Sequence, residues 1–285
     1  MQKEGRKKRK KDLIRGVFVI MEISLLDKSK DNQKYTLFMK DVSLTYANAL
    51  RRAFIEEVPV LAIEEVEFKN NDSILYDEML ALRLGLIPLT TDLKTYEMPP
   101  EDYKSMEDLS AKQKVTLTLK AKGPCTVYAS ELKSKDPAVK PVYPEIPIVK
   151  LVSGQELEFS ATAIMGRGKD HAKWSPCLAY YRQKPVIDIK KKVENAKEVV
   201  DKQPDKIFII KNNNLAVNND QIMSSNLAEE SVALCKPENA VDFSYSDDEL
   251  IFSIESWGQI SCKDIMTKGI KQLEEQCDDF LKMLK

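Results

Sequence analysis

The stretch CKDIMTKGIKQLEEQCDDFLKML, residues 262–284, has the most regular pattern in the chain. Its apolar side chains recur at alternating spacings of four and three residues, at Met266, Ile270, Leu273, Cys277, Phe280 and Leu284. This heptad spacing places one apolar seam along an α-helix of roughly 35 Å. Such a seam can pack inside its own chain, but a terminal helix with so continuous a seam favours association with a partner.

Residues 43–57 predict a second helix, because they contain no Gly or Pro, a polar residue can cap the start, and Pro59 ends the segment. Arg51 completes the apolar side of this helix, whereas Arg52 lies off that side and can pair with Glu56 one turn on. Each arginine either covers the apolar stripe with its stem or anchors carboxylates and carbonyls of a partner. The spacing does not decide between these two roles. The apolar side itself consists of Leu44, Ala47, Phe54 and Val58.

Apolar, β-branched and aromatic residues predict strands over residues 17–26, 35–40, 60–68, 115–121, 157–163 and 249–257. A short helix is expected over residues 77–86. Residues 181–245 predict a compact unit with strands over 186–189, 207–210 and 215–217 and helices over 193–200 and 221–234. Its hairpin turn is expected at Asn212, Asn213 and Asn214. These elements together indicate an α+β fold.

The segment GRGKDHAKW, residues 166–174, is the most unusual loop. Its two glycines permit positive φ or a close approach, and three basic side chains project beside a tryptophan. It could be mistaken for a phosphate-binding loop, but the GxxxxGK[ST] pattern is absent. His171 has no cysteine or acidic partners at a useful spacing, so we expect no catalytic or metal-binding role for it.

The five cysteines lie far apart, form no CxxC pair and have a single histidine to assist them. This usage argues against a structural zinc site and for reduced thiols, each acting as a small buried hydrophobe. The apolar stretch near the amino terminus is too short to cross a bilayer and has no signal cleavage site after it. We therefore expect a cytoplasmic protein without a membrane partner.

Residues 1–20 hold eight Lys or Arg and two acidic residues, whereas the rest of the chain is acidic. A basic arm can bind phosphate groups by releasing counterions. A disordered, solvated extension over residues 1–17 is the simpler interpretation, and the one we favour. Met21 opens the first expected strand, so Met1 and Met21 are both candidate starts.

Four motifs, in this order, resemble the family of archaeal RNA polymerase D subunits, which belongs to the wider α-subunit family. They are NALRR at 48–52, RLGLIPL at 83–89, the loop at 166–174, and IESWG at 254–258. One such motif is suggestive, and four in the family's order are specific. The resemblance spans about residues 21–285.

The resemblance implies a discontinuous dimerisation domain, a sheet with two long helices, formed by residues 18–57 and 246–285. A β-rich insert domain over 58–180 interrupts it and carries a ferredoxin-like module over 181–245. The family's heterodimer with small subunit L implies a partner surface at Leu44, Ala47, Asn48, Arg51, Arg52, Phe54, Met266, Ile270, Leu273, Cys277, Phe280 and Leu284.

The resemblance further implies recruitment of small subunits N and P and of the second-largest catalytic subunit. Implied docking loops comprise Arg83, Gly85, Leu86, Ile87, Pro88, Gly166, Arg167, Gly168, Lys169, His171, Lys173 and Trp174. The magnesium site of such polymerases lies in the largest subunits, so no catalytic residue is expected in this chain. The chain is then expected to contact DNA only as part of the polymerase complex.

Many members of this family bind iron–sulfur clusters through cysteines of the ferredoxin-like module. In residues 181–245 only Cys235 remains, and a cluster needs about four thiolates. We therefore expect no cluster and no other cofactor. The missing cysteines also exclude an electron carrier, and no spacing supports an autonomous enzyme. Nucleic-acid binding by the basic extension stays open, as does the α-like subunit that two eukaryotic nuclear polymerases share.

Overall fold

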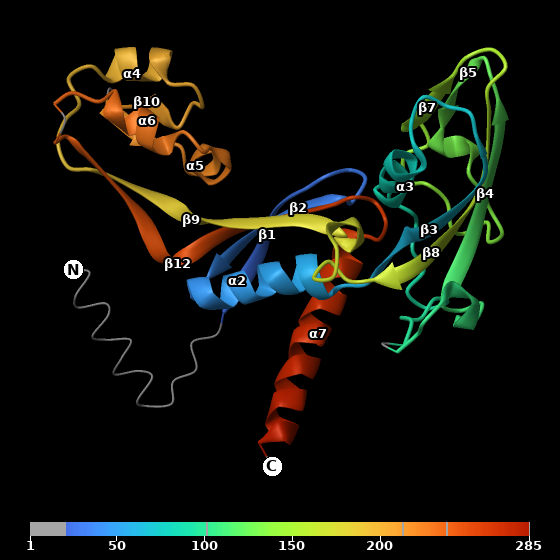
Figure 1. Cartoon of the computed structure of the whole chain (residues 1–285). Coiled ribbons are helices and arrows are strands. Elements are labelled where there is room, and N and C mark those ends of the chain that lie inside the picture. Colours follow the sequence, from blue (N-terminus) through green and yellow to red (C-terminus); the bar gives the residue numbers. More distant parts are fainter. Residues whose placement is uncertain (1–20, 101, 213, 238, 285) are drawn as a thin grey trace. The chain divides into compact units, whose positions relative to one another are not determined.

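The computed structural model describes residues 21–284 except positions 101, 213 and 238 (Figure 1). The extension expected over 1–17 and the start of the strand expected over 17–26 lie outside the described residues. The described residues form two compact units. One comprises residues 21–26, 36–47 and 181–252, and the other comprises 27–35, 48–180 and 253–284. Several antiparallel sheets with few helices agree with the expected α+β class.

The first unit contains a small module of helices and one hairpin. Its elements are α4 (Ala196–Lys202), β10 (Phe208–Lys211), β11 (Asn214–Val217), α5 (Asn219–Ser224) and α6 (Ala228–Ala233). β10 pairs antiparallel with β11, and Asn212 takes a positive φ of 50° in the turn, as expected. The expectation for Asn213 lies outside the described residues. Val199, Phe208 and Cys235 are buried in the core of this module.

The single helix expected over residues 221–234 is wrong, because α5 and α6 are separate. The guanidinium of Arg182 donates to the carbonyl oxygens of Met223 and Ser225, where α5 ends. The Ser225 hydroxyl in turn accepts the backbone N–H of Leu227 at 2.9 Å. These side chains satisfy the backbone groups that a continuing helix would have used, so the helix stops.

Strands β1 (Glu22–Lys28), β2 (Lys34–Lys40), β12 (Val241–Ser256) and β9 (Cys177–Ile189) form a four-stranded sheet in that order. The strand expected over 186–189 is therefore only the end of the longer β9. Pro185 lies inside β9. Because β9 is an edge strand, a residue without an N–H is tolerated within it.

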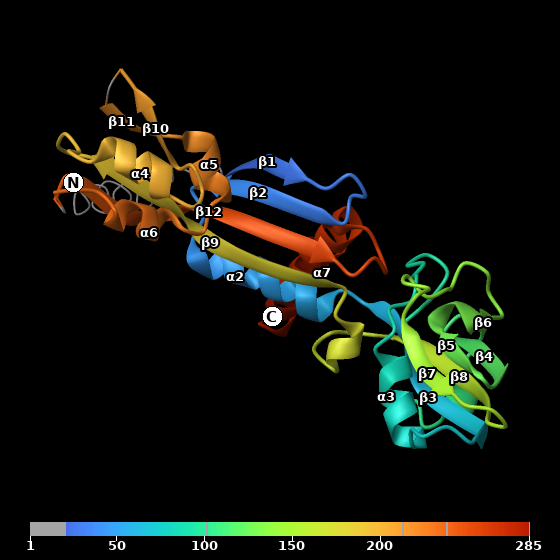
Figure 2. The same cartoon turned by 90° about the horizontal axis from the view of Figure 1, so that it is seen from above.

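A second four-stranded sheet lies in the second unit, in the order β3 (Val60–Asn71), β8 (Glu156–Gly166), β4 (Lys114–Lys122) and β6 (Lys133–Ser134) (Figure 2). β5 (Cys125–Tyr128) and β7 (Pro147–Leu151) form a separate ribbon. Side chains of β4 and β8 alternate between core and solvent: Leu119 pairs with buried Phe159, whereas Lys120 pairs with Glu158. Helix α3 (Asp77–Gly85) packs on β3 and β7.

Helix α2 (Leu44–Arg52) continues as a π-helical turn, η1 (Ala53–Glu57), and the chain straightens at Val58. Helix α7 (Cys262–Met283) starts after Ser261, whose hydroxyl accepts the N–H of Asp264 at 3.2 Å. Both expected long helices are thus confirmed. None of the helices formed by the described residues is long and apolar enough to span a membrane.

Candidate assembly surface

The first two turns of α7 pack against η1 within the second unit. Ile265 is fully buried, and Gly269 faces the ring of Phe54. A Cβ atom at Gly269 would lie 2.5 Å from Cδ1 of Phe54, so only glycine permits this approach. The base of α7 is therefore a fixed part of this chain.

Beyond Gly269 most of the seam of α7 is exposed among the described residues, and Figure 1 shows α7 as one continuous helix. The exposed fractions are 49% for Ile270, 62% for Phe280 and 68% for Leu284. Cys277 is also exposed, whereas Met266 and Leu273 are partly buried. The heptad therefore divides into a short packed part and a long bare part.

The residues expected on the partner side of α2 and η1 divide in the same way. Ala47 and Phe54 are buried inside the chain, with exposed fractions of 0% and 3%. This burial corrects their assignment to a partner surface, because no partner atom can reach them. Leu44 and Asn48 are exposed, so a partner can contact them.

The two arginines of this helix have different local partners. Arg52 forms the expected ion pair with Glu56, with 3.0 Å between Nη2 and Oε2. Arg51 donates from Nε to Oδ1 of Asn48 at 3.1 Å. The hydrogen bond that Arg52 donates to the Glu56 carboxylate, aided by the charge of that carboxylate, raises the pKa of Arg52 above its ordinary value.

The loop at 166–174 binds to its own chain, on η1 and α7. The backbone N–H of Lys169 donates to the carbonyl oxygen of Glu56 at 3.1 Å. A Cβ atom at Gly168 would lie 2.1 Å from the carbonyl oxygen of Ile55, so the loop lies directly on η1. Arg167 reaches Gln272 of α7, with 3.4 Å between Nη2 and Oε1.

Glu57 is the charge at the centre of this contact. Its carboxylate lies 3.6 Å from Nη1 of Arg167 and 3.8 Å from Nζ of Lys169. Because only 15% of the Glu57 side chain is exposed, water screens these pairs less than it would on an open surface. We call Glu57, Arg167, Gly168 and Lys169 the clamp, since they join the loop to η1 and α7.

The second half of the same loop is fixed to the four-stranded sheet of β3, β8, β4 and β6, which we call the insert sheet. Lys173 pairs with Glu64 and lies 4.4 Å from the ring centroid of Trp174. Trp174 is buried and donates from Nε1 to the carbonyl oxygen of Ile164 at 3.3 Å. His171 accepts the N–H of Lys173 at Nδ1, and Gly166 is buried at the end of β8. The exposed residues of this loop, which a partner can reach, are Lys169, Asp170, His171 and Ala172.

The other expected docking segment, RLGLIPL, is mostly an internal joint. Arg83 donates to the carbonyl oxygens of Ile148 at 3.0 Å and Pro147 at 2.6 Å, which fastens α3 to β7. Gly85 and Ile87 are buried, and Pro88 is partly buried. Leu86, by contrast, is 56% exposed.

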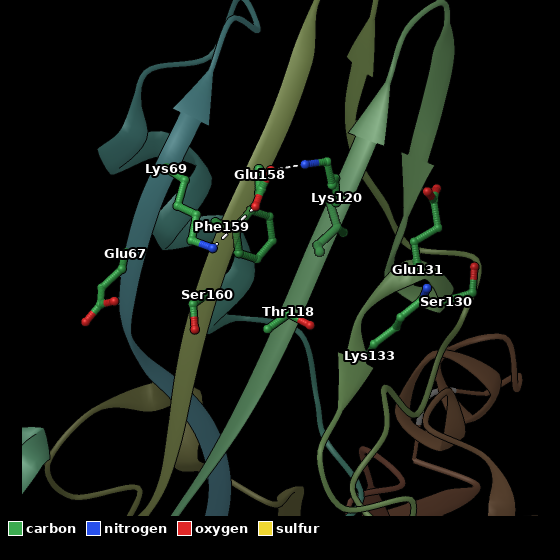
Figure 3. A pocket seen from close by; sticks show the side chains of 11 residues that line it. Glu67, Lys69, Thr118, Lys120, Ser130, Glu131, Lys133, Glu158, Phe159 and Ser160 are labelled. Carbon is green, nitrogen blue, oxygen red and sulfur yellow. Dashed lines mark hydrogen bonds and ion pairs between the residues drawn. The ribbon is translucent and has the colours of Figure 1, made fainter.

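A shallow pocket of about 760 Å³ lies on the outer face of the insert sheet (Figure 3). Glu158 lies at its centre and pairs with Lys69 at 3.4 Å and with Lys120. The hydrogen bond from Lys120 is the main cause of the lowered pKa of Glu158. The carboxylate of Glu158 is held by the two lysines, and none of the lining residues is a nucleophile activated by a base.

The cysteines do not gather into a ligand set. Cys177, Cys235 and Cys262 are buried as expected, but Cys125 is partly exposed and Cys277 is exposed. The last two correct the expectation that every cysteine is buried. Within residues 21–284, leaving aside positions 101, 213 and 238, no three His, Cys, Asp or Glu side chains group as a metal site requires.

Sequence reasoning missed three residues that hold this region together. Gly269 carried a usable signal, since a glycine inside a strong helical pattern often marks close packing. Glu57 and Gln272 carried none, because their partners lie 110 and 105 positions away in the sequence and meet them only in the folded chain.

Comparisons with known proteins show which proteins the chain is similar to. Residues 66–176 match the family model of the RNA polymerase Rpb3/RpoA insert domain. The chain is 37% identical over 277 residues to DNA-directed RNA polymerase subunit Rpo3 of Thermococcus kodakarensis, covering 93% of this chain and 98% of that protein. It is 36% identical over 266 residues to the Rpo3 subunit of Methanosarcina acetivorans, with the same coverage.

The Rpo3 subunit of Pyrococcus furiosus is 48% identical over 179 residues, which cover 63% of this chain. That alignment spans 65% of the Pyrococcus protein, slightly less than two thirds of its length. The Thermococcus and Methanosarcina alignments extend over nearly the whole of both proteins. The chain therefore belongs to the family of archaeal DNA-directed RNA polymerase subunits Rpo3.

Proposed function

We propose that this chain is a non-catalytic assembly subunit of a multisubunit DNA-directed RNA polymerase. The observation that carries the proposal is the seam of α7, which is fixed at its base by Phe54 and exposes Ile270, Phe280 and Leu284. A rigidly held helix with an uncovered apolar face provides a docking platform, because little ordering entropy is lost when a partner binds. The α-like subunit of eukaryotic polymerases is less well supported, since the three relatives named above are archaeal.

The partner on this platform is, in our proposal, a subunit of the L type. It would pair with α7 and with the exposed part of α2, and residues 18–57 and 246–285 would act as one dimerisation domain. Phe280 alone offers about 1–2 kcal/mol, which is the part of a buried phenylalanine's 1.5–3 kcal/mol that its 62% exposure leaves available. Burial of several such side chains would supply more binding free energy than a weak, transient contact needs.

Further partners follow from the same proposal. Small subunits N and P and the second-largest catalytic subunit would join after the heterodimer forms, and catalysis would arise only in the complete enzyme. DNA would be met only through that complex, in the cytoplasm. The chain would bring no iron–sulfur cluster and no other cofactor, since Cys235 is the single cysteine in residues 181–245.

Co-expression with an L-type subunit of an archaeal polymerase tests the proposal. We expect the chain alone to be poorly soluble or self-associated, and a one-to-one complex to form with the subunit, measured by size-exclusion chromatography with light scattering. Phe280→Glu places an unpaired charge in the seam and should weaken the pair by at least about 100-fold. Leu273→Glu should behave similarly.

Lys282→Glu is the matched control, because Lys282 lies on the opposite face of α7 and is 74% exposed. It changes the charge of the helix more than Phe280→Glu does but should spare the complex. A stable monomer that ignores the L-type subunit would refute the proposal. Equal weakening by both substitutions would also contradict it, since charge rather than the seam would then govern binding.

A further inference from the structure

A second apolar surface lies far from α7 in the chain, on helix α3 of the insert domain. Ile74, Tyr76, Met79, Leu82 and Leu86 have exposed fractions between 50% and 83%. Met79, Leu82 and Leu86 follow one another at spacings of three and four, so they share one face of the helix. We call these five residues the α3 patch.

The buried face of α3 explains why the patch points outward. Leu80 and Leu84 have no exposed surface and belong to the core of the insert domain. Arg83, between them, is bonded to the carbonyl oxygens of Ile148 and Pro147, so α3 cannot roll to hide the patch. The apolar face is thus exposed because the packing of Leu80 and Leu84 and the hydrogen bonds of Arg83 fix the orientation of α3.

The segment leading into α3 is equally well fixed. The side chain of Asn71 donates to the carbonyl oxygen of Leu75 at 2.9 Å and to Oδ1 of Asp77 at 2.7 Å. Ser73 donates to the Asn71 side chain at 2.6 Å. These bonds hold Ile74 and Tyr76 in place before any partner arrives, which lowers the entropic cost of binding.

The charges next to the patch are mostly negative. Asp72, Asp77 and Glu78 are exposed next to it, and none of the three forms an ion pair among the described residues. The cation in the helix, Arg83, is already engaged with backbone carbonyls. A partner must therefore meet apolar side chains at the centre and carboxylates at the rim.

We infer that the α3 patch is a second docking surface, for a protein whose apolar contact face is rimmed by Lys and Arg. Pairing of two copies through this patch would bring Asp77 and Glu78 against their own equivalents, which costs energy. An anionic lipid surface is disfavoured for the same reason. The inference rests on the proposed function, because it takes the partner to be another subunit of the same polymerase.

Two methionines allow the test to separate this inference from the proposed function. Met79 is 50% exposed on the α3 patch, and Met283 is 84% exposed on α7. Hydrogen peroxide converts exposed methionine to the sulfoxide, and peptide mass spectrometry measures the rate at each position. Met39 and Met165, both 2% exposed, serve as buried references.

We expect Met283 to be protected already in the binary complex with the L-type subunit, whereas Met79 is still oxidised. In the complete polymerase the oxidation of Met79 should slow by at least about tenfold. Equal rates at Met79 in the two samples overturn the inference and leave the proposed function standing. An unprotected Met283 in the binary complex refutes the proposed function instead.

Leu82→Glu distinguishes an apolar contact from a purely electrostatic one. The added carboxylate would strengthen binding if charge alone held the basic partner, but it should restore Met79 oxidation if the centre of the contact is apolar. Leu82→Met, which conserves volume, should keep the protection. Glu78→Lys, at an exposed position that no core contact depends on, should also weaken protection, so that the test survives a folding defect in Leu82→Glu.

Carbodiimide cross-linking checks the chemistry of the partner, because it joins a carboxylate to an amine in direct contact. We expect cross-links from Asp77 or Glu78 to lysines of another polymerase subunit. Protection of Met79 without such cross-links overturns the basic rim, and cross-links between two copies of this chain overturn the choice of partner.

Discussion

Gly168→Ala tests the clamp, because the structure gives this glycine a specific reason to lack a side chain. The new Cβ atom would lie 2.1 Å from the carbonyl oxygen of Ile55 and 3.1 Å from its carbon. Ordinary contacts of this kind need about 3.5 Å, so the loop must retreat from η1 by roughly 1.4 Å. Both contacts are to backbone, which cannot rotate away.

The cost follows from what that retreat breaks. Overpacking at a rigid contact costs about 1–3 kcal/mol. The bond from the Lys169 N–H to the carbonyl oxygen of Glu56, now 3.1 Å, contributes about 1 kcal/mol more. The pair between Arg167 and Glu57 lengthens at the same time. We therefore expect the free energy of unfolding to fall by about 2–4 kcal/mol.

Urea denaturation of the chain bound to its L-type partner measures the effect. The fluorescence of buried Trp174, in a Trp257→Phe background, reports on the unit that contains the clamp. Gly85→Ala is the control, since its Cβ would lie 3.4 Å from the nearest atom, the carbonyl oxygen of Ile63. Because Gly85 ends α3, alanine there should be neutral or stabilising by up to about 1 kcal/mol. Equal unfolding midpoints for the two variants would refute the proposed geometry of the clamp.

Three further outcomes are expected. Burial raises the pKa of the Cys177 thiol to about 12, so above pH ~9 the unfolded chain releases this proton and the folded chain keeps it. Cys177 should therefore lower stability by up to about 1.4 kcal/mol per pH unit above that pH. Because burial also raises the pKa of Cys235 and Cys262, Cys177→Ala should reduce the slope in urea titrations without removing it. Iodoacetamide should alkylate exposed Cys277 in the free chain and leave Cys177 unmodified, as peptide mass spectrometry will show; rapid labelling of Cys177 would contradict its burial. Anaerobically purified protein should show no absorbance band near about 400 nm and no stoichiometric iron, whereas a band with bound iron would reverse the cofactor prediction.

Local periodicity predicted most elements of the chain. Both long helices, the helix α3 and the strands β3, β4 and β8 follow from apolar spacing and from the Pro and Gly residues that bound them. The errors have tertiary causes. α5 and α6 are separate because Arg182, which lies in strand β9, donates hydrogen bonds to the carbonyl oxygens at the end of α5. β9 is longer than expected because an edge strand accepts Pro185.

The candidate surfaces were predicted less completely than the elements that carry them. The spacing in α7 identified an apolar seam but gave no boundary between its packed and exposed parts. That boundary depends on Gly269 and Phe54, which are far apart in the sequence and meet only after folding. The α3 patch was missed for a related reason, since an apolar helix in a sequence suggests a core, and only burial shows which side faces water.

The sequence by itself determined the helices, most strands, the acidic body and, through four motifs, the family. Periodicity and composition act over short distances along the chain, so they are visible without a structure. The tertiary structure alone decided which of these residues a partner can reach. In the folded chain Ala47, Phe54 and Trp174 are buried, and the basic loop is paired with Glu57. Most of the apolar seam of α7 is exposed. Exposure is a property of all the neighbours of a residue at once, and those neighbours come from distant parts of the chain.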